Sequence, residues 1–185
     1  KLGKSSEELL LQYSVEVLES KAKPYDDPRG DFVRAIDVIV YDHERAAQRR
    51  VLSAEEIEQY YRRAFDPVIN ITLLAIDSNL RSDDVPALSY GQGRVYSARD
   101  FETDWERGII NLPREIVSMA GLTPNSSFGD VRNNQTIADW FHQSLIRTKP
   151  DLLEAHELIR QYGERQTQVV FNRLISPILK YIEAH

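Results

Sequence analysis

Apolar side chains recur every three or four residues along most of the chain, and this spacing restricts it to amphipathic helices. The first stretch with the pattern, residues 5–21, aligns on one helix face Leu9, Leu10, Tyr13, Val17 and Leu18. Alternating apolar and polar residues bounded by hairpin turns, which indicate strands, are missing. The sequence therefore predicts an all-α protein built as a helical bundle.

Capping residues, glycines and prolines set the expected helix boundaries. Ser53 opens a capping box with Glu56, and the helix after it is predicted to reach about residue 79, kinked or split at Pro67. Ser6 is the expected cap of the first helix, and Gly108 the stop of a long one. The remaining helices are predicted over 31–41, 82–107, 113–121, 136–146 and 150–182, and loops over 23–30 and 123–134.

Composition excludes several classes of protein. The 185 residues include 23 basic and 29 acidic side chains, a net charge of −6 that argues against nucleic-acid binding. Cysteine is absent, which removes disulfides, zinc–thiolate sites and thiol nucleophiles. No apolar run approaches the roughly 18 residues of a transmembrane helix. We expect one all-α domain over residues 1–185, complete or the C-terminal part of a longer chain, in the cytoplasm.

The most informative stretch is residues 99–113, RDFETDWERGIINLP. On a helix, Asp100 and Asp104 stand four residues apart, so both carboxylates project from one face. Such a pair suits Mg²⁺, which prefers hard oxygen ligands and is often shared with substrate phosphates. Arg99 and Arg107 flank the pair and offer planar guanidinium groups to phosphate oxygens. A solvated salt-bridge face is the alternative.

This stretch resembles the second aspartate-rich motif of the squalene/phytoene synthase family, R-D-x-x-x-D-x-x-x-G-R-x-x-L-P. The matching positions are Arg99, Asp100, Asp104, Gly108, Leu112 and Pro113. Upstream, Asp42 and the segment 53–61 (SAEEIEQYY) resemble another family segment in the same order. The resemblance covers about residues 42–122.

The resemblance implies an isoprenoid synthase fold and a transferase that joins two prenyl diphosphates head to head. It assigns catalysis and Mg²⁺ binding to Asp100 and Asp104, and contacts with the small-molecule prenyl diphosphate to Arg99 and Arg107. It also implies a cavity that keeps water from a carbocation. Candidate wall residues, for which core packing is the alternative, are Tyr60, Phe65, Tyr96 and Phe101.

Some positions depart from the family pattern. Gly93 and Tyr96 stand where the family usually carries Gln and Asn, and Ile109 replaces an arginine. Asp27 and Asp31 have the spacing of a first aspartate-rich motif, but the prolines and glycine of 23–30 predict a loop, so that motif is expected upstream of residue 1.

These departures support a second hypothesis, a non-catalytic helical relative that serves as an isoprenoid-binding, assembly or dimerisation module. The apolar stripe of the last predicted helix either closes the bundle or forms a dimer face. The oligomeric state and peripheral membrane contact stay open. Arg45, Arg49 and Arg50 are interpreted as surface residues that pair with Glu55 and Glu56, the alternative being that they face a diphosphate.

Overall fold

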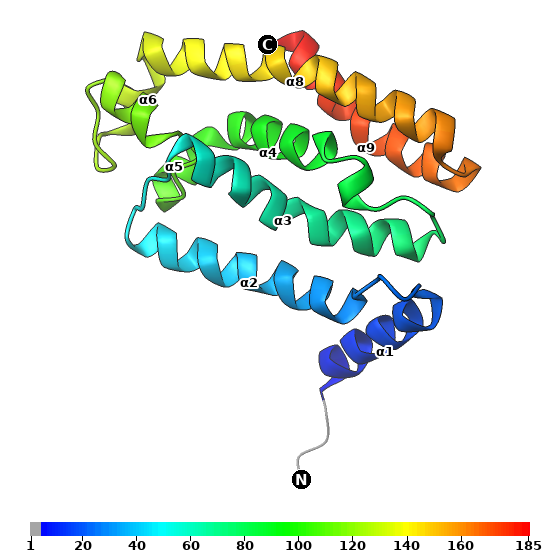
Figure 1. Ribbon diagram of the computed structural model, residues 1–185. Helices are drawn as coiled ribbons and strands as arrows, with labels where there is room; N and C mark the ends of the chain where they lie inside the picture. Colours follow the sequence, from blue (N-terminus) through cyan, green and yellow to red (C-terminus); the bar gives the residue numbers. More distant parts are fainter. Residues whose placement is uncertain (1–4) are drawn as a thin grey trace.

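The computed structural model describes residues 5–185, which form nine α-helices and one turn of 3₁₀ helix, without strands (Figure 1). The all-α prediction is therefore confirmed for this part of the chain. The elements are α1 (Ser6–Lys21), α2 (Pro28–Ala47), α3 (Ala54–Ala75), η1 (Ser82–Asp84), α4 (Ala87–Arg99), α5 (Phe101–Arg107), α6 (Arg114–Met119), α7 (Phe128–Arg132), α8 (Gln135–Tyr162) and α9 (Arg165–Ala184).

The long helices stack in the order of the chain. α2 packs on α3, α3 on α4, and α4 on both α8 and α9, which also pack on each other. Figure 1 shows α1 at the outer edge beside the N-terminal end of α2. The short helices α5 and α6 lie at the opposite end, near the C-terminal end of α2 and the start of α3. That end holds the stretch that the sequence marks as informative.

Helix starts follow the capping chemistry closely. Ser53 accepts from the backbone N–H of Glu56, whose side chain returns to the Ser53 backbone, so the predicted capping box is confirmed. Ser5, rather than the predicted Ser6, caps α1.

The first turn of α2 corrects the prediction of a loop over residues 23–30. Asp27 caps the helix, its Oδ1 accepting from the Gly30 N–H at 2.9 Å, and Pro28 occupies the first turn. Proline is favourable there because its missing N–H would have no partner in the helix anyway. Asp27 and Asp31 therefore stand on the first turn of α2, where both pair with Arg34.

Prolines divide the helices less than the sequence predicts. α3 runs through Pro67 as one helix, and α8 runs through Pro150, where the sequence predicts a break. The neighbouring Leu152 is fully buried, which offsets the backbone hydrogen bond that proline removes. The chain turns instead at Gly163, where an added Cβ would lie 2.5 Å from the Ile159 carbonyl oxygen.

The predicted helix over 82–107 is in fact three elements. η1 ends at Asp84, α4 begins after Pro86, and Asp100 separates α4 from α5 with φ −95° and ψ 8°. The predicted stop is confirmed, because Gly108 has φ 88° and its N–H closes the last turn of α5. Residues 123–134, predicted as loop, contain α7.

The largest apolar core lies between α3, α4, α8 and α9. Fully buried side chains contributed by these four helices include Leu73, Leu88, Leu152 and Phe171. Within residues 5–185, every helix is too short or too polar to cross a bilayer.

α3 approaches α4 closely at Gly93. A Cβ added there would lie 2.2 Å from Cγ and Cδ1 of Tyr61, a side chain only 1% exposed. The absence of a side chain at residue 93 thus makes room for the Tyr61 ring.

We predict that Gly93→Ala lowers the free energy of unfolding by about 1–3 kcal/mol, because overpacking outweighs the roughly 1 kcal/mol gain in helix propensity. Urea denaturation followed by circular dichroism measures the change. Gly129→Ala is the matched control, since its nearest neighbour would be 3.7 Å away, and it should be neutral or stabilising. Equal stability of Gly93→Ala and the wild type would contradict the close contact.

Candidate functional site

Asp100 and Asp104 lie one helical turn apart at the junction of α4 and α5. The Asp104 N–H donates to the Asp100 carbonyl oxygen at 2.9 Å, which keeps the turn helical although Asp100 itself belongs to neither helix. The two carboxylates are near enough for the charge of Asp100 to raise the pKa of Asp104. The junction therefore brings the two predicted metal ligands together.

Asp100 is already neutralised by Arg99. Nε and Nη2 of Arg99 each donate to one oxygen of the Asp100 carboxylate, both at 2.7 Å. The guanidinium also lies 4.4 Å from the centroid of the Tyr96 ring. Both side chains of the ion pair are about half exposed, so Arg99 can exchange Asp100 for another anion at small cost.

Asp104 has a different environment. Its described side-chain partner is a neutral amide, Nδ2 of Asn111, which donates to Oδ2 at 3.1 Å. Burial is the main cause that raises the pKa of Asp104 to about 6, and the charges of Asp100 and Asp42 add to it. Arg45 and Arg107 oppose the shift without reversing it. Asp104 is thus a partly buried carboxylate whose negative charge is incompletely compensated.

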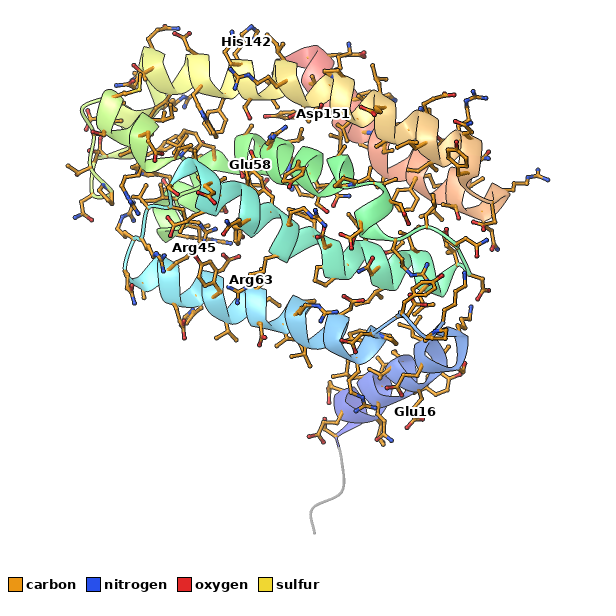
Figure 2. All side chains as sticks on the ribbon, viewed as in Figure 1. Glu16, Arg45, Glu58, Arg63, His142 and Asp151 are labelled. Carbon is orange, nitrogen blue, oxygen red and sulfur yellow. The ribbon has the colours of Figure 1, made fainter. Side chains whose placement is uncertain are left out.

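Arg45 lies behind this carboxylate and is not the surface residue that the sequence predicts. Figure 2 labels Arg45 near the C-terminal end of α2. It is 2% exposed, and its guanidinium lies 4.2 Å from the ring centroid of Tyr60. Nε donates to Asp42 and Nη2 to Oδ1 of Asn111, each at 2.7 Å. Nη1 is buried without a described partner. Arg45 therefore joins α2 to the segment between α5 and α6.

The other two arginines of this cluster differ from each other. Arg50 pairs with Glu56 near the surface, as predicted. Arg49, just after α2, instead donates to two backbone carbonyls, those of Trp105 in α5 and of Pro124 in the loop between α6 and α7. Arg107 is exposed at the C-terminal end of α5, and its charge reaches Asp104.

The candidate wall residues do not share one space. Tyr60 packs with the small cluster around Leu52, and its hydroxyl donates to Asp42 at 2.8 Å. Tyr96 and Phe65 pack against the main core, their ring centroids 5.8 Å apart. Phe101 belongs to a third cluster, formed by α5, α7 and α8. Core packing thus accounts for the position of all four aromatic side chains.

Five hollows in the surface of residues 5–185 are lined by residues other than those predicted to hold the cation and the diphosphate. One of them, of about 180 Å³, is lined by the candidate wall residue Tyr60 together with Tyr41, Glu56, Gln59 and Arg63. None of the five includes Asp100, Asp104, Arg99 or Arg107 in its lining. The predicted site is therefore an open, partly exposed junction in residues 5–185.

The donor set at the junction suits a hard cation. Two carboxylates one turn apart provide the oxygen ligands that Mg²⁺ prefers, and it commonly binds through one or two carboxylates plus water or phosphate. Burial is the main cause that raises the pKa of Asp104, and a cation between Asp100 and Asp104 would offset it and relieve the added repulsion from Asp100. No group of three or more acidic or histidine side chains suitable for a metal occurs in residues 5–185, so the remaining ligands would have to come from elsewhere.

The sequence predicts a surface position for Arg45, which is wrong, and it gives no role to Asn111. A signal for Arg45 exists, because the buried face of α2 repeats every seven residues through Asp31, Val38 and Arg45. Two of these three are charged, so a search for apolar periodicity alone overlooks the stripe. Asn111 lies between two apolar residues, Ile110 and Leu112, both fully buried, which places its backbone in the interior.

Comparison with known proteins gives one informative result. The family model described as squalene/phytoene synthase matches residues 13–185. The match includes the whole of the resemblance over residues 42–122 and extends it in both directions. Neither the search of curated proteins nor that of solved structures gives a significant match.

We predict that Asp104→Asn stabilises the protein at neutral pH. Because the folded-state pKa of Asp104 is raised to about 6, the stability it contributes is present below its ordinary pKa near 3.8 and lost as pH rises through about 6. At pH 7.5 the free energy of unfolding of the variant should exceed that of the wild type by about 1–2 kcal/mol. This is less than the full pKa shift implies, because the carboxylate is partly solvated.

Urea denaturation at several pH values measures this difference, which should shrink toward zero near pH 4. The matched control is Asp139→Asn, at an exposed carboxylate on α8. A constant difference between Asp104→Asn and the wild type across the whole range would contradict the assigned environment.

Proposed function

Because the chain belongs to the squalene/phytoene synthase family, we propose that it binds a prenyl diphosphate at the junction of α4 and α5 and takes part in joining two such substrates head to head. Asp100 and Asp104 would hold Mg²⁺, and Arg99 and Arg107 would contact the diphosphate. The observation that carries this proposal is the incompletely compensated Asp104 carboxylate beside Asp100, one turn away.

Family membership supports a prenyltransferase-type activity, and the local chemistry supports the choice of residues. When bound, Mg²⁺ supplies positive charge that stabilises a departing diphosphate. Asp104 is held by the Asn111 amide, a neutral donor that fixes the carboxylate without cancelling its charge. Charge that remains on Asp104 is available to attract a cation, which a salt-bridged carboxylate offers less strongly.

Arg99 would have two successive roles, one before and one after a cation binds. In the described structure it neutralises Asp100 through a bidentate ion pair. Once Asp100 bears a cation, the same planar guanidinium can turn to phosphate oxygens, which it binds with equal geometric fit. The pair is half exposed, so this exchange of partners needs little desolvation.

A second candidate is a non-catalytic relative that binds an isoprenoid or another protein. The observation that favours it is the contact between Gly93 and Tyr61, because the aromatic ring fills the space in front of α4 where the family usually has a polar side chain. Tyr61 is also hydrogen bonded to Ser97, at 3.1 Å, which fixes the ring there. Such a relative would bind ligands without releasing diphosphate.

We predict that the 185-residue chain binds farnesyl or geranylgeranyl diphosphate only when Mg²⁺ is present. Asp100→Asn and Asp104→Asn should each weaken this binding at least about tenfold, or about 1.4 kcal/mol, because each removes a charged ligand. Isothermal titration calorimetry with Mg²⁺ or EDTA measures the binding, and Asp139→Asn is the control.

Release of diphosphate by the same samples separates the two candidate functions. Release that needs Mg²⁺ and both aspartates supports the transferase, whereas Mg²⁺-dependent binding without release supports the non-catalytic relative. Binding that is equally tight in EDTA would refute the site itself.

We predict opposite effects of Arg99→Gln on two ligands. Loss of the ion pair frees Asp100, so the affinity for Mn²⁺, used as a probe of the Mg²⁺ site, should rise by up to about fivefold. Affinity for the prenyl diphosphate should fall by about tenfold or more, because a charged hydrogen-bond donor is lost. Arg160→Gln, which removes an exposed arginine paired with Glu157 on α8, is the matched control. A parallel change for both ligands would show that Arg99 does not exchange partners.

A further inference from the structure

We propose that Arg45 and Asn111 are positioning residues that hold the Asp104 carboxylate in place beside Asp100. Nothing in the family motif assigns a role to either residue, and the proposal rests on the function proposed above for Asp104. The evidence is a continuous chain of hydrogen bonds that crosses from α2 to α5.

The series of hydrogen bonds begins on α2 and α3. The Tyr60 hydroxyl donates to one oxygen of Asp42 at 2.8 Å, and Arg45 Nε donates to the other at 2.7 Å. Arg45 Nη2 then donates to Asn111 Oδ1 at 2.7 Å, and Asn111 Nδ2 donates to Asp104 at 3.1 Å. Residues 60 and 104 are thus connected through three intermediate side chains.

Arg45 determines which way the Asn111 amide faces. A guanidinium group only donates hydrogen bonds, so the amide must turn its oxygen toward Arg45. The amide nitrogen is then left to face Asp104, where a donor is needed by an acceptor-only carboxylate. With the amide reversed, nitrogen would oppose guanidinium and oxygen would oppose carboxylate. The guanidinium therefore selects the one orientation that supports Asp104.

The burial of the Arg45 guanidinium indicates that it does more than form an ion pair with Asp42. Arg45 is 2% exposed, so its guanidinium bears the cost of giving up its hydration. Besides Asp42 and Asn111, it contacts only the side chain of Tyr60 among its described strong partners. An apolar side chain of similar volume would avoid that cost. Of the two hydrogen bonds of Arg45, the one to Asp42 fixes the guanidinium and the one to Asn111 continues to Asp104. Retention of a guanidinium here is explained if its task is to orient Asn111.

The test compares four variants of the 185-residue chain, one of which, Asp104→Asn, serves only the amide-signal readout. Arg45→Lys keeps the positive charge but loses the forked geometry that reaches Asp42 and Asn111 together, and Asn111→Ala removes the amide. Arg63→Lys controls for the loss of a guanidinium–ring contact, because exposed Arg63 lies 4.6 Å from the Tyr41 centroid and makes no described bond to Asn111. Circular dichroism shows whether each variant folds. If Arg45→Lys does not fold, Asn111→Ala still tests the proposal.

Two readouts are combined. Mn²⁺ affinity, measured by electron paramagnetic resonance, should fall about 10- to 100-fold in Arg45→Lys and Asn111→Ala and stay unchanged in Arg63→Lys. The side-chain amide signal of Asn111, identified by its loss in Asn111→Ala, should shift in Arg45→Lys and in Asp104→Asn but not in the control. A purely structural role for Arg45 would leave the Mn²⁺ affinity of every folded variant unchanged.

The outcomes separate this proposal from the function on which it rests. If the wild type binds Mn²⁺ and both variants bind it equally well, the positioning role is overturned and the proposed function stands. If the wild type binds no Mn²⁺, the proposed function fails, and the amide signal decides alone. An Asn111 signal that is the same in Arg45→Lys and in the wild type would then overturn the positioning role as well.

Discussion

A guanidinium group cannot be buried cheaply, and much of the local structure at one end of this bundle follows from satisfying Arg45. Its partners come from α2, from α3 through the ring of Tyr60, and from Asn111 after α5. Three parts of the chain that are distant in sequence must meet for these contacts to form. The same meeting brings Asp104 against Asn111 and so places the aspartate motif at the C-terminal end of α2. The buried charge and the candidate site are therefore two aspects of one polar network.

Local signals in the sequence predict much of the fold because they act over a few residues. The capping box at Ser53 depends on residues three positions apart, and the left-handed φ of Gly108 is a property of that residue, so both predictions are made locally and are confirmed. Pro150 was misleading because the packing of Leu152 outweighs a local preference. The break at Asp100 and the burial of Arg45 depend on contacts across the fold. For the same reason, the motif predicts which carboxylates matter but not what surrounds them.

The chain belongs to the family, yet α4 carries Gly93 where the family usually has a polar side chain. Packing against Tyr61 explains how the fold accommodates this difference. The family match extends over residues 13–185, so the scaffold is that of the squalene/phytoene synthases. Within it, Gly93 and Tyr61 form a matched pair, since the ring occupies the volume that a side chain at residue 93 would need. Burial raises the pKa of Tyr61 to about 12, so the ring stays neutral and packs as part of the core. A scaffold can accept such an exchange of volume between facing helices without a change of fold.

The two aspartates of the motif are not equivalent, and in the proposed site this difference decides which of them would govern cation binding. Asp100 already has a bidentate cationic partner, so a metal ion gains from Asp100 only what remains after Arg99 is displaced. Asp104 has a neutral donor and bears an energetic cost for its charge, which a cation would relieve. Affinity for a cation should therefore depend mainly on how firmly Asp104 is held. In the proposed site, the amide of Asn111 and the guanidinium that orients it would therefore contribute to cation binding although neither would touch the metal.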